Sequence, residues 1–312
     1  MEKNTTYPFR KCPQCFHSRN NPDVELKPNS NAASFTFEEL SQFWWGFRKN
    51  NTFFDYIRCS NCSQLYCYQY FDETQLNSLY DLMPDNTDGV KHETLARTQS
   101  SYINFLYKFR NPSGIYLEIG PDLGQSTEAA VRVGKSRNSP ISKAVLVEPN
   151  KAVHETLRTI NHDIEVSLVT DISELVANSM AGEAVVIHVL DHLLDPSKYL
   201  LNIREQLRPG GLILIVVHDE RCMLRKILGR RFPPFTLQHP QLFNRSTLRN
   251  FLIFNGFNVL KIKKTTNYFP LSHLAATLCR VVGINEKYSK VFPKWVVPLR
   301  LGNIMVVAEV VN

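Results

Sequence analysis

The chain has 312 residues, 43% of them hydrophobic and 21% charged, a globular composition that allows one large domain or two modest ones. Its first residues, MEKNTTYPFRKC, contain no apolar signal region, and no run of about 18 uncharged apolar residues occurs, so neither secretion nor a membrane span is predicted. We therefore expect a cytoplasmic protein. The sequence does not indicate an oligomeric state.

The net charge of +7 is unevenly distributed along the chain. Residues 1–110 carry 12 basic and 12 acidic side chains, residues 111–220 carry 9 and 15, and residues 221–312 carry 15 and 2. The last third is therefore a polycation, which favours an anionic partner such as a phosphorylated small molecule, a nucleic acid or an acidic membrane surface. A solvated basic face without a partner is the alternative.

Two CxxC pairs lie near the amino terminus, separated by 43 residues, and consist of Cys12 with Cys15 and Cys59 with Cys62. Cysteines in a chain without a signal peptide should be reduced thiols, so metal binding is considered before a disulfide. Two such pairs supply the four sulfur ligands of a closed, structural Zn²⁺ site. The spacing therefore predicts a small zinc-binding module, with redox use of a single pair as the alternative.

We place this module at residues 1–84 and a second domain at residues 85–312, because the polar stretch MPDNTDG at 83–89 is typical of a hinge. Within the module, residues 35–47 and 72–82 have helical patterns, and residues 64–71 alternate like a strand. After the hinge, residues 91–109 show helical spacing of apolar residues.

The stretch from Gly114 to Gly134 organises the second domain. Residues 115–119 are apolar apart from Glu118 and typical of a buried parallel strand, Gly120 and Gly124 bracket a tight turn, and residues 126–133 predict a helix. Glu118, near the carboxyl end of the strand, would repel a pyrophosphate and attract the amino group of a methionine moiety. Glu148 ends the next apolar run, where an acid can bind a ribose diol.

At these residues the chain resembles the class I S-adenosylmethionine-dependent methyltransferases. Glu118, Gly120, Gly124 and Glu148 match the family's cofactor-binding motifs, whereas the usual middle glycine is Asp122. The resemblance implies an α/β fold with a Rossmann-like seven-stranded sheet whose last strand is antiparallel, and S-adenosyl-L-methionine as cofactor. It also implies that Asp171, after the third strand, lies near the adenine, although Asp171 could instead cap a helix.

The stretch AVVIHVLDHLLDP predicts a fourth strand that ends in a histidine-rich turn. The resemblance implies that His188 lies under the cofactor and His192 near the reacting centre. Histidines four apart could instead bind a metal, but no glutamate follows His188 as in HExxH. A buried structural role for His192 is the other alternative. Further on, we expect a basic insertion around 219–240 and a helical insertion around 267–301.

The zinc module extends the resemblance to sugar C-methyltransferases and to methyltransferases of polysaccharide and natural-product pathways. In the sugar enzymes a glutamate-histidine pair after the fifth strand lies at the acceptor, and Gln238-His239 falls at that place. The resemblance implies that His239 is the catalytic base, with His192 next. Gln238 would orient the ring by hydrogen bonding. Alternatively, His239 caps the following helix.

These patterns predict an enzyme that transfers a methyl group from S-adenosylmethionine to a small anionic acceptor, a sugar or nucleotide-linked sugar. The alternative is a nucleic-acid-binding protein or methyltransferase that uses the zinc module and the basic last third. Against it, the Asn/Asp-Pro-Pro-aromatic motif of enzymes that methylate base amino groups does not follow the fourth strand. Basic and aromatic residues also do not alternate as they do in a groove for single-stranded nucleic acid. Glu118 and the missing glycine disfavour an NAD-dependent dehydrogenase, while Asp122 leaves a non-catalytic descendant open. The acceptor and the methylated atom stay undetermined.

Overall fold

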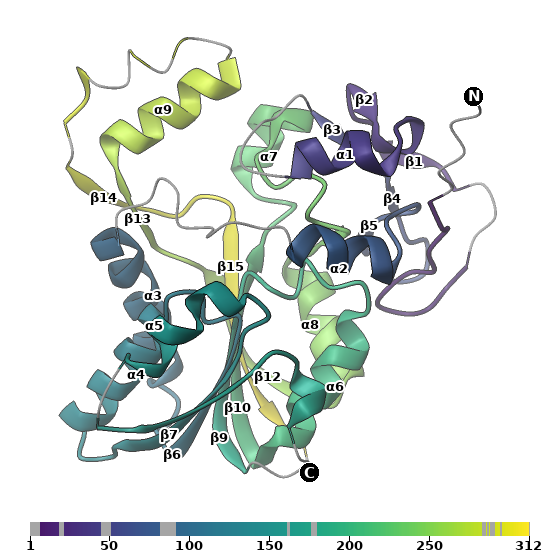
Figure 1. The fold of residues 1–312 in the computed structure, drawn as a ribbon. Coiled ribbons are helices and arrows are strands. Elements are labelled where there is room, and N and C mark those ends of the chain that lie inside the picture. Colours follow the sequence, from purple (N-terminus) through teal and green to yellow (C-terminus); the bar gives the residue numbers. More distant parts are fainter. Residues whose placement is uncertain are drawn as a thin grey trace.

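A seven-stranded sheet with helices on both faces forms the larger part of the protein, and a smaller amino-terminal module lies over one end of it (Figure 1). The computed structural model describes residues 7–18, 22–44, 51–81, 92–160, 163–175, 180–282, 285, 287, 291–293 and 295–311. The predicted domain boundary at residues 84 and 85 lies outside the described residues. Within these ranges, no helix combines the length and the apolar character needed to cross a bilayer.

The large sheet has the strand order β12-β15-β10-β9-β6-β7-β8, which confirms the expected seven-stranded sheet. Neighbours from β10 to β8 are parallel, whereas the last strand, β15, inserts antiparallel between β10 and β12. The strands comprise β6 (Gly114–Ile119), β7 (Ile141–Val147), β8 (Glu165–Val169), β9 (Ala181–Ile187), β10 (Leu207–His218), β12 (Phe257–Lys264) and β15 (Asn303–Val310).

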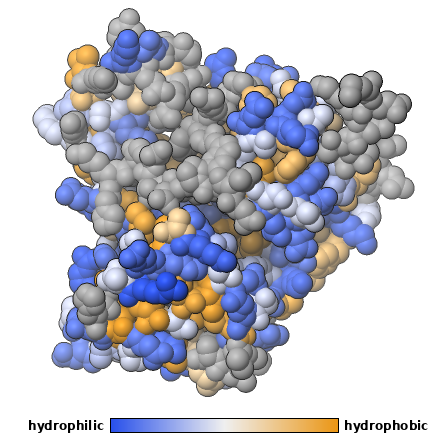
Figure 2. Space-filling view, in the orientation of Figure 1, coloured by the Kyte–Doolittle hydropathy of each residue, from blue (hydrophilic) through white to orange (hydrophobic). Residues whose placement is uncertain are grey.

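The continuous apolar strands have cores on both of their faces. In β10, Ile213 and Ile215 belong to one cluster while Leu212 and Leu214 belong to the other, as the two-residue period of a strand requires. Helices α3 (His92–Leu106), α4 (Gln125–Ser136) and α5 (His154–Arg158) supply the second cluster, and α6 (Pro196–Gln206) and α8 (Arg245–Phe254) the first. On the face shown in Figure 2, hydrophobic and hydrophilic residues are interspersed among the described residues.

The amino-terminal module contains a four-stranded sheet of β1 (Val24–Leu26), β4 (Tyr56–Arg58), β5 (Leu65–Cys67) and β11 (Gln241–Leu242). Its edge strand, β11, thus comes from a distant part of the chain. The module also holds the paired strands β2 (Ser30–Asn31) and β3 (Thr52–Phe53) and the helices η1 (Ala32–Ser34), α1 (Phe37–Trp44) and α2 (Glu73–Asp81).

The basic segment after β10 packs into the core of this module. It forms α7 (Met223–Leu228) and η4 (Gly229–Arg231), and its buried Phe232, Phe235 and Leu237 join the module's aromatic cluster. For example, the rings of Phe53 and Phe235 stack with centroids 5.7 Å apart. The predicted insertion therefore links the two parts of the protein through a shared hydrophobic core.

The segment expected to be helical around 267–301 contains one helix flanked by strands. Helix α9 (Leu271–Val282) lies between β13 (Asn267–Pro270) and β14 (Val296–Leu299), which pair as an antiparallel hairpin. Aromatic and β-branched residues in both strands favour this pairing. Two short 3₁₀ helices, η2 (Lys151–Val153) and η3 (Ile172–Glu174), follow β7 and β8.

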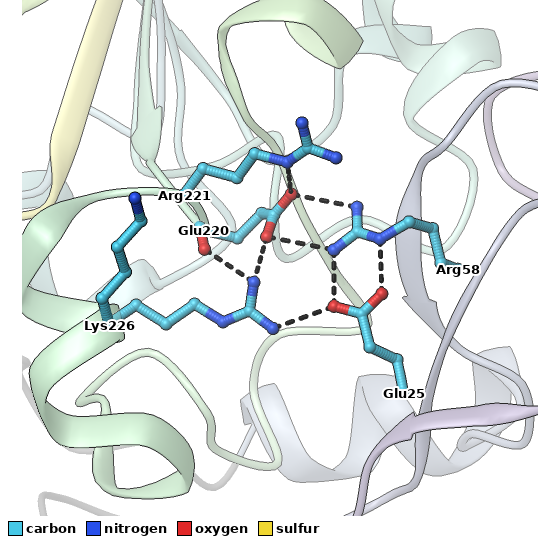
Figure 3. A pocket seen from close by; sticks show the side chains of 6 residues that line it. Glu25, Arg58, Glu220, Arg221 and Lys226 are labelled. Atoms are coloured by element: carbon cyan, nitrogen blue, oxygen red, sulfur yellow. Dashed lines mark hydrogen bonds and ion pairs between the residues drawn. The ribbon is translucent and has the colours of Figure 1, made fainter.

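An ion-pair network joins the module to the large sheet (Figure 3). Glu220, just after β10, is fully buried and accepts hydrogen bonds from Arg58 of β4, from Arg225 of α7 and from the Asn244 amide (2.7 Å). Glu25 of β1 completes the network by pairing with both arginines. Because Asn244 also caps α8, one carboxylate ties together four separate segments of the chain.

We expect Glu220→Gln to lower the free energy of unfolding by about 3–5 kcal/mol, because it leaves two arginines facing a neutral amide in a buried network. Urea unfolding followed by circular dichroism measures the change. The control is Arg221→Gln, since Arg221 also contacts Glu220 but its side chain is 58% exposed; its effect should stay below about 1 kcal/mol. Equal effects of the two substitutions would show that the buried network does not hold the parts together.

Candidate functional site

The turn between β6 and α4 has the tight backbone that its glycines predict. Gly120 and Gly124 have φ angles of 64° and 77°. A Cβ atom at Gly124 would lie 1.8 Å from a carbon of Ile160, and one at Gly120 would lie 2.7 Å from a carbon of Val189. Asp122 also adopts a left-handed conformation, with φ of 53°, which aspartate tolerates better than most residues. The departure from glycine thus preserves the backbone of the loop.

Glu118 points into the protein and is almost fully buried. Its carboxylate accepts hydrogen bonds from the hydroxyls of Tyr116 (2.9 Å), Thr127 (2.6 Å) and Ser126. Burial raises the pKa of Glu118, and these hydrogen bonds oppose the rise. The carboxylate therefore joins β6 to the first turn of α4, and a contact with the amino group of a methionine moiety stays a prediction.

Glu148, at the end of β7, holds the glycine loop from the other side. It accepts hydrogen bonds from the backbone N–H groups of Asn150 (2.9 Å) and Asp122 (3.3 Å). Burial raises its pKa, and these bonds oppose the rise. Asp171 is exposed and caps η3 by accepting from the Ser173 backbone, as the alternative interpretation predicted. Its role near an adenine stays a prediction.

Buried polar atoms beside the loop lack partners among the described residues. They are the amide nitrogen and oxygen of Gln125, at the start of α4, and Nδ1 of His188, which follows β9. Val189 contacts the position of Gly120, so both sets of atoms belong to the surroundings of the loop. Unpaired buried polar groups are costly. Their presence fits a polar ligand such as S-adenosylmethionine, which Glu148 and the glycine loop would hold.

A cluster of histidines around one aspartate lies at the carboxyl ends of β9 and β10. Asp191 is fully buried, and its carboxylate accepts from the backbone N–H of His218 at 3.2 Å. The ring centroids of His188 and His218 are 4.6 Å apart, those of His192 and His239 are 4.4 Å apart, and those of His218 and His239 are 5.0 Å apart. The structure thus brings together all three histidines that the sequence singled out, although their roles stay predictions.

The sequence interpretation missed His218. It ends the apolar run LILIVVH, and its position at the carboxyl end of the fifth strand, beside that of the fourth, could have indicated it. Asp191 was visible in the histidine-rich turn but received no role.

His239 is oriented by its own loop. Its Nδ1 donates to the carbonyl oxygen of Pro234 at 2.7 Å and lies 3.1 Å from the Thr236 hydroxyl, so Nε2 carries the lone pair. The expectation that Gln238 orients the ring is wrong, because its amide donates to the Trp44 carbonyl at 3.1 Å. His239 does not cap a helix either, since Asn244 caps α8.

Burial dominates the electrostatics of this cluster. It lowers the pKa of His239 well below the usual range, lowers that of His192, and lowers that of His188 to about 3. Burial alone would raise the pKa of Asp191, but the surrounding histidines, His218 foremost, lower it. These shifts favour an ionised Asp191 beside neutral His188, His192 and His239.

The amino-terminal module holds the segment that carries His239. The Tyr56 hydroxyl donates to the carbonyl of His239 and the Tyr70 hydroxyl to that of Leu237. Arg10 donates to the Pro240 carbonyl at 3.0 Å. The module therefore forms one wall of the cluster.

The four predicted zinc ligands converge in the module. The Sγ atoms of Cys12 and Cys62 are 3.4 Å apart and those of Cys15 and Cys59 are 3.5 Å apart. Tetrahedral Zn²⁺ with bonds near 2.3 Å requires about 3.8 Å between sulfurs. The pKa of the Cys62 thiol is lowered to about 5, chiefly because Cys12 donates to it. The donor set and spacing fit a zinc ion, whose presence stays a prediction.

Comparison with known proteins agrees with this geometry. Residues 92–262 match a family model described as a methyltransferase domain. The fold is similar to the 1,6-didemethyltoxoflavin-N1-methyltransferase of Burkholderia thailandensis with bound S-adenosylhomocysteine, at 14% identity and a TM-score of 0.50, covering 82% of this chain and 99% of that one. The N-methyltransferase NodS of Bradyrhizobium japonicum WM9 is 12% identical in sequence, with a TM-score of 0.49. The match covers 77% of this chain and 100% of that one. No curated protein matches the chain.

We expect Glu148→Ala to weaken the binding of S-adenosylhomocysteine at least tenfold, because a charge-assisted hydrogen bond to a ribose contributes about 1.5–3 kcal/mol. Isothermal titration calorimetry measures the affinity. The matched control is Glu155→Ala, which removes an exposed carboxylate of α5 and should leave the affinity unchanged within about twofold. Unchanged affinity in Glu148→Ala would mean that the nucleoside is held elsewhere.

For the zinc site, we expect Cys12→Ser to lose one zinc ion per chain relative to the wild type. Its Tm should fall by at least about 5 °C, because a structural zinc site contributes folding free energy. Elemental analysis of the purified protein measures the metal, and Cys279→Ser, outside the cluster, is the control. Identical zinc contents in the wild type and Cys12→Ser would exclude the site.

Proposed function

The chain belongs to the methyltransferase-domain family, and from this premise we propose that it methylates a small anionic acceptor, a sugar or nucleotide-linked sugar. S-adenosylmethionine supplies the methyl group when bound. In this proposal Glu148 and the glycine loop hold its nucleoside, Asp171 lies near the adenine, and His188 lies beneath it. The methyl group is transferred towards the carboxyl ends of β9 and β10.

The observation that carries the proposal is the unpartnered Nε2 atom of His239. Its Nε2 is buried and has no hydrogen-bond partner among the described residues, while Nδ1–H is committed to the Pro234 carbonyl. Transfer of a methyl group to a hydroxyl or a carbon requires removal of a proton, and a neutral imidazole can accept it. His192, whose ring lies 4.4 Å from that of His239, is the second candidate.

Basic side chains beside the ion-pair network support an anionic acceptor. A cavity of about 460 Å³ is lined by Arg221 and Lys226 together with the ion-pair network (Figure 3). Glu220, which lines it, follows His218 by two residues in the chain, whereas the histidines of the cluster are not among the residues that line the cavity. Arg221 and Lys226 extend from α7 and the residues before it. Their charges would attract the phosphates of a nucleotide-linked sugar.

We expect His239→Gln to lower turnover with S-adenosylmethionine and a nucleotide-linked sugar acceptor by about 10²-fold or more, because general-base catalysis contributes about that factor. The affinity for S-adenosylhomocysteine should change little. Radiolabelled methyl transfer measures the first quantity and calorimetry the second.

The matched control is His273→Gln on α9, whose ring stacks on Phe269 outside the cluster. It should retain normal turnover. Near-normal turnover in His239→Gln would remove this residue from the chemistry and leave methyl transfer to positioning alone.

A further inference from the structure

Asp191 is shared by two groups of three possible metal ligands. One group adds His188 and His218, and the other adds His192 and His239. In each group the ligand atoms lie within 4.8 Å of one another. A metal ion needs a lone pair from every histidine, so the hydrogen bonds of the rings decide which group can bind one.

The first group fails this test because Asn303 bridges its two histidines. The amide oxygen of Asn303 is 2.9 Å from Nδ1 of His218, and its nitrogen is 3.3 Å from Nε2 of His188. One end of an amide accepts and the other donates. The ring that donates to the amide oxygen keeps its lone pair on the other nitrogen, which faces away from Asn303. The ring that accepts from the amide nitrogen uses its lone pair for that bond, and this holds in either orientation of the amide. His188 and His218 therefore cannot both bind an ion in this arrangement.

The second group passes the test. The Pro234 carbonyl fixes the proton of His239 on Nδ1 and leaves a lone pair on the buried Nε2. Nδ1 of His192 lies 3.4 Å from the Tyr80 hydroxyl, which can accept its proton and leave Nε2 unprotonated. A hydrogen bond from the outer ring nitrogen is the usual support of a metal-binding histidine.

The charge of the cluster also calls for a cation. The Oδ1 atom of Asp191 is buried and has no hydrogen-bond partner among the described residues, while Oδ2 lies 4.0 Å from Nε2 of His218. Arg10 packs against the same turn, but its guanidinium donates to the carbonyls of Leu194 and Pro240 and to the Gln241 amide. A buried carboxylate with one unpartnered oxygen and only a histidine ring at 4.0 Å from the other is unfavourable, and a bound cation would balance its charge.

We propose that Asp191, His192 and His239 bind one divalent transition-metal ion, with zinc as the reference ion. Two imidazoles and one carboxylate are a ligand set that such ions prefer, and three protein ligands leave a position open for an oxygen of the acceptor. The inference rests on the site of the proposed function and deepens it. A hydroxyl oxygen of the acceptor on the ion would release its proton to solvent water more readily, which would leave an alkoxide to take the methyl group. His239 would then be a metal ligand, and that water would replace it as the proton acceptor.

The test uses the full chain with its four-cysteine site filled by zinc and Co²⁺ as the probe, titrated without cofactor or acceptor. We expect the wild type to bind one Co²⁺ per chain, with the weak d–d absorption of nitrogen and oxygen ligands. His239→Gln and Asp191→Asn should bind Co²⁺ at least about 100-fold more weakly. Tyr80→Phe, which removes only the outer partner of His192, should weaken binding about 10-fold.

His218→Gln is the matched control, because it changes a neighbouring imidazole outside the proposed ligand set and should bind Co²⁺ normally. The proposal is overturned if the wild type takes up no Co²⁺ beyond the cysteine site, or if His218→Gln loses as much affinity as His239→Gln. The wild-type titration decides the question even where a variant does not fold. Because no methyl transfer is measured, failure here leaves the test of the proposed function unaffected.

Discussion

The hydrogen bonds from two buried tyrosines to the backbone of residues 237–239 are the interaction on which the site depends. Tyr56 and Tyr70 donate to the carbonyls of His239 and Leu237. Both rings lie in the core of the amino-terminal module, which is closed by β11, the strand that follows His239. Each buried carbonyl would be costly without its partner. The loop therefore adopts its position only while the module is folded, and the four cysteines belong to that module.

The proposed site consists of two halves with different origins, one for the cofactor and one for the acceptor. The cofactor half is local: β6, the glycine loop and α4 are consecutive, Glu118 accepts hydrogen bonds from the first turn of α4, and Glu148 accepts one from the loop. The acceptor half is assembled over long sequence distances, from the turn after β9, the end of β10, the loop before β11 and α2 of the module. This division is expected, because proteins that share a fold often keep one common site and differ in the residues that bind their particular substrate.

The local half could be predicted from the sequence because its signals are periodic or stereochemical. Continuous apolar runs indicated the parallel strands, and the glycines indicated left-handed turns where any side chain would collide with its neighbours. The CxxC spacing likewise indicated the convergence of four thiols. In the strands and the glycine turns, the decisive residues lie close together in the sequence. In the CxxC pairs, the residue type itself indicates the structure, because paired cysteines have few other roles.

The acceptor half could be predicted only in part, because its contacts join residues far apart in the chain. Nothing near Gln241 indicates that it extends a sheet with Tyr66, some 175 residues earlier, and no pattern predicts that Gln238 turns away from His239 to reach Trp44. Which ring nitrogen of each histidine carries the proton depends on carbonyl and amide groups that contact the ring only in the folded chain.

A crystal structure with S-adenosylhomocysteine tests the central claim most directly, namely that both halves face one reaction centre. The account predicts that the ribose contacts Glu148. It also predicts that the sulfur atom faces the side chains of Asp191, His192 and His239, with no backbone segment between them. A nucleoside bound away from the glycine loop, or a sulfur separated from these side chains by the turn after β9, would contradict it.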